Sequence, residues 1–245
     1  MKSKKIFAIV LTLASLILHA FHYLIFRDLH HILIFSFHEI AFLPLEVLIV
    51  SLVLEEIIHR INRKERKSRA KMIIGAFFSE VGTNLLYLLA RKLPEDYKAN
   101  FIPEKLEEKL SLKEIEFSLF LKNLDIPQQI YLDRKDLVEI KAFLDQKRQF
   151  IVNILENPAL TEDDSFTKTA FATIHLSDEL SYRKDLLKIS DEDLEHLRGD
   201  ALRTLSHLIA EWLAYMRFVK DRYSYLYSLS IRANPFIEER KVELG

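Results

Sequence analysis

The hydrophobic and polar positions divide the chain into an apolar N-terminal part and a longer part with helical periodicity. Residues 6–26 contain no Asp, Glu, Lys or Arg. At about 1.5 Å per residue, a helix of this length is about 31 Å long, which matches the hydrocarbon core of a bilayer. We therefore predict an uncleaved transmembrane helix at 6–26. A cleaved signal peptide is the alternative, but its apolar core is typically shorter.

A second apolar segment, 32–54, follows after a short link and carries two carboxylates. Its Leu, Ile, Val and Phe side chains favour membrane insertion by about 7 kcal/mol, whereas Glu39 and Glu46 oppose insertion by about 5–7 kcal/mol. Because these contributions nearly cancel, we expect insertion to depend on pairing with the first helix or with other copies of the chain. The short link then requires an antiparallel transmembrane hairpin.

Basic residues on both sides of this predicted hairpin indicate its orientation. Three Lys precede the first span. Seven basic residues follow the second: Arg60, Arg63, Lys64, Arg66, Lys67, Arg69 and Lys71. The positive-inside rule then predicts a multi-pass protein of the inner cell membrane with both termini in the cytoplasm. The outer turn would contain Arg27, Asp28, His30 and His31.

The seven basic residues are expected to contact anionic lipid headgroups. A nucleic-acid site is less favoured, because no aromatic residues are interleaved with the basic ones. The net charge of −1 also provides no general attraction to nucleic acid. The expected partners are therefore the bilayer and further copies of the same chain.

From Met72 onward the pattern predicts helices. They are expected at 104–123, 134–156, 162–189 and 191–231, after a linker between Pro94 and Pro103. The expected N-terminal caps are Ser111, Asp133, Thr161 and Ser190. The predicted domains are the hairpin at 1–58, a basic segment at 59–71, a cytoplasmic helical domain at 72–235 and a tail at 236–245. The fold class is therefore all-α, a transmembrane hairpin followed by a cytoplasmic helical bundle with a long C-terminal helix.

Two of these segments carry particular packing patterns. Residues 72–90 are mostly apolar but interrupted by polar residues, so we expect an interfacial or core helix, with a third span as the alternative. Gly75, Ser79 and Thr83 lie four residues apart on one face, which is typical of close helix packing; ordinary core packing is equally compatible. In 191–231 a heptad-like seam predicts packing along another long helix, in the same chain or in another copy.

Composition excludes several classes of protein and site. Four Gly and six Pro among 245 residues argue against a loop-rich β-sandwich or barrel. The absence of Cys excludes disulfide frameworks, iron–sulfur sites and cysteine nucleophiles. The chain also lacks the motifs of phosphate-binding loops, dinucleotide-binding folds, zinc metalloproteases and α/β-hydrolases. We therefore predict no catalytic residue, and no cofactor other than the metal or haem that is the weakest alternative below.

One group of candidate site residues lies in the predicted hairpin. Six of the nine His precede residue 60. His19, His22, His38 and Glu39 lie at similar distances from the turn, so an antiparallel hairpin would bring them to one depth, with Glu46 two turns deeper. Ionisable side chains in a membrane are costly and indicate function. This polar layer could be a structural hydrogen-bonded pairing, a proton or ion pathway, or a metal or haem site.

Three stretches resemble a family of uncharacterised prokaryotic two-span membrane proteins. They are HYLIFRDLHHILIFSFHEIAFLPLEVLIVSLVLE (22–55), IIGAFFSEVGTNLLYLL (73–89) and YSYLYSLSIRANPF (223–236). The resemblance covers nearly the whole chain. It implies a membrane hairpin followed by a helical domain, and it carries over no activity, cofactor or catalytic residue.

These observations lead to three functional hypotheses. The first is a non-enzymatic, membrane-anchored helical protein with a signalling, scaffolding or recruitment role. The second is an oligomeric ion or proton channel lined by the Glu39 and Glu46 face. The third and weakest is a membrane protein that binds a metal or haem.

Overall fold

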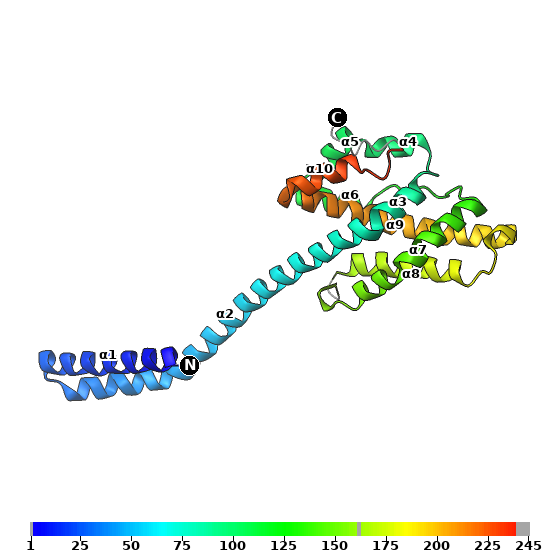
Figure 1. Ribbon diagram of the computed structural model, residues 1–245. Coiled ribbons are helices and arrows are strands. Elements are labelled where there is room, and N and C mark those ends of the chain that lie inside the picture. Colours follow the sequence, from blue (N-terminus) through cyan, green and yellow to red (C-terminus); the bar gives the residue numbers. More distant parts are fainter. Residues whose placement is uncertain (1, 161–162, 239–245) are drawn as a thin grey trace. The chain divides into compact units, whose positions relative to one another are not determined.

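The computed structural model describes residues 2–160 and 163–238, and these are helices joined by short connections, with no strand among them (Figure 1). The predicted all-α fold is therefore confirmed. The chain divides into two compact units, unit 1 at Met1–Arg63 and unit 2 at Lys64–Gly245.

Unit 1 contains α1 (Lys2–Phe26) and the first part of α2 (Leu29–Phe77). The two helices lie side by side (Figure 1) and both contribute residues to one pocket. The link is Arg27 and Asp28, and Arg27 reverses the chain with a positive φ of 51°. The Asp28 carboxylate accepts a hydrogen bond from the backbone N–H of His31 at 3.0 Å, which caps the start of α2.

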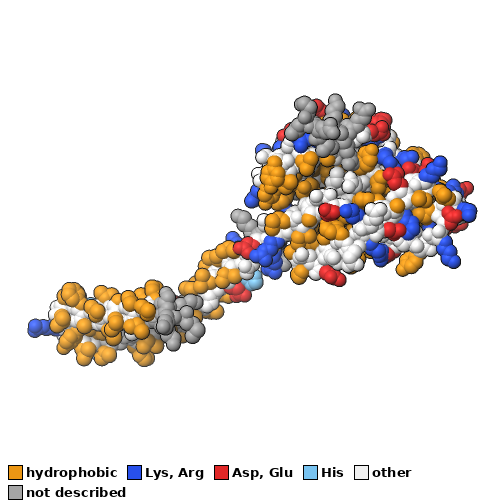
Figure 2. All heavy atoms as spheres, in the orientation of Figure 1, with side chains coloured by type: hydrophobic (Ala, Val, Ile, Leu, Met, Phe, Trp, Pro, Cys, Tyr) orange, Lys and Arg blue, Asp and Glu red, His pale blue; other side chains and the backbone are white. Residues whose placement is uncertain are grey.

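The surface of unit 1 is apolar. Apart from Ile32, the large apolar side chains between Ile6 and Ile61 are 47–76% exposed. Figure 2 shows them along the visible face of this unit. Two helices have too little mutual contact area to bury such a number of side chains.

One described helical segment, Ile6–Phe26, is long and apolar enough to cross a membrane. Its mean hydropathy is 2.0 and none of it is buried. This segment is the first predicted span. The second predicted span, 32–54, lies within α2 and stays a prediction.

Unit 2 is a bundle arranged around one long helix, α9 (Asp191–Arg222). The chain enters it through the end of α2 and then forms the π-helix η1 (Phe78–Gly82), α3 (Thr83–Ala90), α4 (Glu95–Lys98), η2 (Ala99–Phe101), α5 (Pro103–Leu110), α6 (Glu114–Lys122), α7 (Arg134–Leu155), η3 (Pro158–Leu160), α8 (Asp164–Ser181), η4 (Leu186–Lys188), α9 and α10 (Ser224–Arg232). Helices α8, α3, α10 and α5 pack on α9, and α7 packs on α8.

The ambiguous segment 72–90 lies in the core of unit 2. Phe77, Leu85 and Leu89 are fully buried, so core packing is the alternative that the structure supports. The heptad-like seam of α9 is buried as well, for example at Leu205 and Leu208. Helices of the same chain cover this seam, so its partner is intramolecular.

Some predicted boundaries are confirmed. Helix α7 follows its expected range closely, because Asp133 accepts hydrogen bonds from the backbone N–H groups of Lys135 and Asp136. Ser190 caps α9 by accepting from Asp193 N–H at 3.1 Å. The expected cap Thr161 lies outside the described residues.

Other predicted boundaries are wrong. The helix expected at 104–123 is two helices, because the chain turns at 111–113. Ser111 does not cap the second one, since its hydroxyl donates to the Glu107 carbonyl at 2.7 Å and closes the end of α5. The N-terminus of α6 is capped instead by a hydrogen bond in which the Lys113 N–H donates to the side chain of Glu116 at 3.1 Å.

The helix expected at 191–231 is also two helices. It breaks at Tyr223, whose φ of −141° and ψ of 74° are not helical. The linker expected between Pro94 and Pro103 contains α4 and η2. The predicted tail begins too early, because Phe236 is buried and stacks on Phe101 with ring centroids 4.0 Å apart.

Candidate functional site in unit 2

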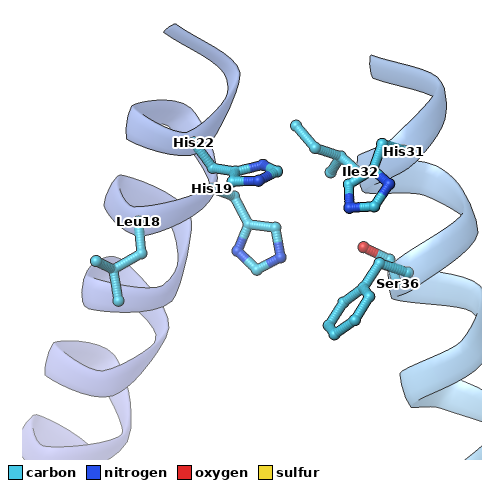
Figure 3. A pocket seen from close by; sticks show the side chains of 7 residues that line it. Leu18, His19, His22, His31, Ile32 and Ser36 are labelled. Carbon is cyan, nitrogen blue, oxygen red and sulfur yellow. The ribbon is translucent and has the colours of Figure 1, made fainter. Parts of the chain in front are cut away.

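The structure does not bring all residues of the predicted polar layer of unit 1 together in one place. His19 and His22 of α1 line a pocket of about 270 Å³ together with His31 of α2 (Figure 3). The rings of His22 and His31 have centroids 6.1 Å apart. Because helix α2 starts directly after Asp28, the α2 residues that lie opposite His22 are those close to the link, such as His31. His38 and Glu39 lie further along α2 and do not line this pocket.

The remaining members of that layer face outward. His38 and Glu39 are exposed, and the His38 ring contacts Phe42 of its own helix at 5.4 Å between centroids. Glu46 is exposed too, and so is His30 of the predicted outer turn. Any function of these residues stays a prediction.

The predicted headgroup residues are exposed wherever their side chains are described. Arg60 pairs with Glu56 at 2.6 Å and Arg69 with Glu65 at 3.5 Å, both one helical turn apart. The other exposed members are Arg63, Arg66, Lys67 and Lys71. The side chain of Lys64 lies outside the described part.

The small-residue stripe of Gly75, Ser79 and Thr83 lines the wall of a pocket of about 580 Å³ in unit 2. We call this the aromatic pocket. Its lining residues are Lys71, Met72, Gly75, Ala76, Phe78, Ser79, Thr83, Asn84, Trp212, Tyr215, Phe218, Val219, Tyr223, Tyr225, Leu226, Leu229, Ser230 and Ala233. The stripe therefore forms part of a pocket wall, and close helix packing along it stays a prediction. Pockets of this size with mostly apolar walls and a few polar groups are typical ligand sites.

The wall of the aromatic pocket contains the π-helix η1. Such single π-turns often occur at functional sites. Here the turn places Phe78 against Tyr215 of α9, with stacked rings 5.1 Å apart. Gly82 permits this geometry, because a Cβ atom at that position would lie 2.6 Å from Phe78 Cδ1 and 2.8 Å from Phe77 Cε1.

Two polar groups in the wall come from α2 and α9. Lys71 Nζ lies 5.1 Å from the centre of the Phe218 ring, a cation–π distance. Burial raises the pKa of the Tyr215 phenol, and its hydrogen bond with Ser230 opposes that rise. The phenol therefore stays protonated at neutral pH. The pocket combines apolar surface with one cation at its edge.

A smaller cavity of about 220 Å³ shares Lys71, Tyr215 and Phe218 with the aromatic pocket. It contains the Glu211 carboxyl, which is 5% exposed and accepts a hydrogen bond from the Ser165 hydroxyl at 2.7 Å. Burial raises the pKa of Glu211 to about 7, and nearby Asp163 adds to the rise. The bond from Ser165 and the charge of Lys71 act against it.

Comparison with known proteins identifies the family. The model "Uncharacterized protein MJ1433, C-terminal helical domain" matches residues 66–232, and the model "MJ1433, N-terminal helical domain" matches residues 1–58. The chain belongs to the MJ1433 family. It is 36% identical to uncharacterized protein MJ1433 of Methanocaldococcus jannaschii over 232 residues, which cover 94% of this chain and 92% of that relative. No solved structure matches the chain.

The two MJ1433 models correspond to the two units of the structure. The first model ends at residue 58 and the second begins at 66, and the unit boundary at Arg63 lies between them. The sequence marks three residues of the aromatic pocket, Gly75, Ser79 and Thr83, but predicts only helix packing for them and no pocket. Glu211 was missed, because a single Glu in a helix carries no sign that its environment is apolar.

Proposed function

We propose that this MJ1433-family chain is an integral membrane protein whose unit 2 is a non-enzymatic binding module in the cytoplasm. In this proposal α1 and residues 32–54 of α2 form a transmembrane hairpin. The observation that carries it is the exposed apolar surface of unit 1. Contiguous apolar surface of this extent is far larger than soluble monomers show, and a bilayer would cover it.

The role proposed for unit 2 is signalling or recruitment through the aromatic pocket. Its walls suit an apolar or amphipathic ligand, and Lys71 at the edge favours an anionic group on that ligand. The basic residues from Arg60 to Lys71 would contact anionic headgroups.

Single-cysteine labelling tests the membrane part of this proposal. The chain has no Cys, so each introduced thiol is the only reactive one. Leu29→Cys in intact cells should react with a membrane-impermeant maleimide, whereas Asn100→Cys should react only after the cells are opened. Both positions are exposed in the structure. Labelling of Asn100→Cys in intact cells would contradict the cytoplasmic location of unit 2. Loss of both variants from membranes washed with alkali would contradict a transmembrane hairpin.

Energy transfer from Trp212 tests the pocket. Trp212 is the single tryptophan and lines the aromatic pocket. We expect a fluorescent fatty acid such as cis-parinaric acid to quench its emission in a saturable way in the full chain held in lipid nanodiscs. Ser79→Phe should fill the pocket and weaken the quenching at least tenfold, whereas Ser228→Phe, outside the pocket on α10, should not. Equal quenching in both variants would contradict ligand binding there.

The second candidate function is the oligomeric channel, which one observation favours. Glu39 and Glu46 are exposed on unit 1, so within a bilayer they need water or another copy of the chain. An assembly with these residues facing its axis would satisfy both. Glu39→Gln should then abolish proton or cation flux into liposomes without changing the mass of the assembly. Wild-type protein without flux would exclude this function.

A further inference from the structure

A cluster of two histidines and two carboxylates lies between α8 and α9, away from the aromatic pocket. His175 and Glu179 are one turn apart on α8, and His196 and Asp200 are one turn apart on α9. The two helices pack directly on each other. Each helix therefore presents one imidazole and one carboxylate to the same point.

The ligand atoms of His175, Glu179 and Asp200 all lie within 4.8 Å of one another, and His196 lies next to the two carboxylates. His175 Nε2 lies 3.5 Å from Asp200 Oδ1, and His196 Nε2 lies 3.5 Å from Asp200 Oδ2 and 3.6 Å from Glu179 Oε2. These separations are too long for ordinary hydrogen bonds. Ligand atoms held at 2.0–2.1 Å around a tetrahedral Zn²⁺ ion are about 3.3 Å apart.

Asp200 points to a ligand independently of these distances. Its side chain is 3% exposed, and Oδ2 has no hydrogen-bond partner among the described residues. Oδ1 accepts from Arg203 Nη1 at 2.9 Å. A buried carboxylate oxygen without a partner is costly and is rarely kept without a reason. Oδ2 lies 3.5 Å from His196 Nε2, on the side of the cluster.

The two arginines next to this cluster, Arg183 and Arg203, still allow a metal ion to bind. Arg183 bridges Glu179 and Asp193 at 2.8 Å each, which holds the Glu179 carboxylate in place on the α8 side. Arg203 is 58% exposed, so it can withdraw from Asp200 into solvent when a cation binds. The half-exposed rings of His175 and His196 give an entry path from the surface.

We propose that His175, Glu179, His196 and Asp200 bind one divalent first-row transition metal of the Zn²⁺ type. Two imidazoles and two carboxylates suit such an ion, whereas Mg²⁺ and Ca²⁺ prefer oxygen ligands alone. The bound metal cross-links α8 and α9, because each helix supplies two of its ligands. This site lies in unit 2 and is separate from the His19, His22 and His31 pocket of unit 1.

Cobalt titration of the untagged, chelator-treated full chain tests the site. Co²⁺ in a tetrahedral protein site gives visible absorption bands, and these should saturate with one equivalent and disappear on addition of Zn²⁺. His175→Ala/His196→Ala should abolish the bands, and Asp200→Asn should weaken Co²⁺ binding at least tenfold. Both histidines are about half exposed, so the double variant should keep the helix content of the wild type.

The matched control removes the other histidine pocket. His22→Ala/His31→Ala should keep both the bands and their stoichiometry. Zn²⁺ should also raise the melting temperature of this control and of the wild type, but not of the cluster variant. The proposal is overturned if wild-type protein gives no tetrahedral cobalt bands, or if the bands survive in the cluster variant and vanish in the control.

Discussion

The two units of the molecule contain similar apolar residues and place them in opposite environments. Leu13 of unit 1 is 53% exposed, whereas Leu85 of unit 2 is fully buried. In unit 2, α8, α3, α10 and α5 pack on α9, and α7 packs on α8, so their apolar faces cover one another. In unit 1, two helices share one narrow contact, and most apolar side chains face outward. The difference shows that the burial of a leucine depends on how many elements surround it. In the proposed function, the bilayer covers the apolar side chains of unit 1 that no other helix covers.

Several buried polar groups of unit 2 have hydrogen-bond partners within the bundle, in contrast to Asp200 Oδ2. Buried Asn234 donates to the Phe101 carbonyl at 2.7 Å and accepts from Phe236 N–H at 3.0 Å. Buried Thr173 donates to the Thr169 carbonyl at 2.8 Å. Each of these bonds satisfies a group that would otherwise be costly to bury.

The largest expected effect comes from the same substitution made in each unit. Leu85→Ala should lower the free energy of unfolding by about 2–5 kcal/mol, because it leaves a cavity in a fully packed core. Leu13→Ala, at an exposed position, should change it by less than about 0.5 kcal/mol. Denaturant unfolding in mild detergent measures both. Equal losses would mean that unit 1 has a packed core of its own.

A pH-dependent effect is expected at Glu211. Folded protein keeps the carboxyl proton to about pH 7, whereas the unfolded chain releases it near the ordinary pKa of 4.5. Between these values the folded state binds more protons, so stability falls as pH rises, by about 3 kcal/mol in total. Glu211→Gln should therefore match the wild type at pH 4.5 and exceed it in stability at pH 8.

Unfolding curves at several pH values check this expectation. Glu104→Gln, an exposed residue of α5, serves as the control and should leave the pH profile as it is in the wild type. A parallel pH profile for wild type and Glu211→Gln would show that Glu211 is hydrated in solution.

The glycines of unit 2 give a smaller contrast. Gly82→Ala should destabilise by about 1–3 kcal/mol, because the added methyl group would overlap the rings of Phe77 and Phe78. Gly199 lies within α9, and beyond its own helical backbone and chain neighbours no atom lies within 4 Å of an added Cβ, so Gly199→Ala should be neutral or stabilising by up to about 1 kcal/mol. Thermal melts of the two variants compare them directly. The packing around η1 would be contradicted if Gly199→Ala lowered the melting temperature and Gly82→Ala left it unchanged.

Local signals in the sequence account for the features that could be predicted. Asp133 and the Asn157–Pro158 pair mark the ends of α7, and the apolar run 6–26 marks the candidate span. The break at Tyr223 carries no Gly or Pro, and it occurs where the Tyr223 ring packs edge-on against Phe218. Such a tertiary contact has no local signature.

The candidate sites show the same limit. The His175 cluster unites two His-x-x-x-acid pairs, each of which is a common pattern on one helix. Their meeting depends on how α8 packs against α9, and the sequence alone does not specify that packing. The aromatic pocket likewise depends on the tertiary placement of α10 beside the end of α2.

Spin-label accessibility along unit 1 tests most directly whether its exposed apolar surface faces lipid. Single cysteines at Leu13, Leu48 and Tyr182 carry nitroxides in chain reconstituted into liposomes, with Tyr182 as the exposed position in unit 2. If unit 1 lies in the bilayer, oxygen should relax the Leu13 and Leu48 labels strongly and a water-soluble nickel complex should not reach them, and the Tyr182 label should behave in the opposite way. Ready access of the nickel complex to the Leu13 and Leu48 labels would contradict the proposed transmembrane hairpin.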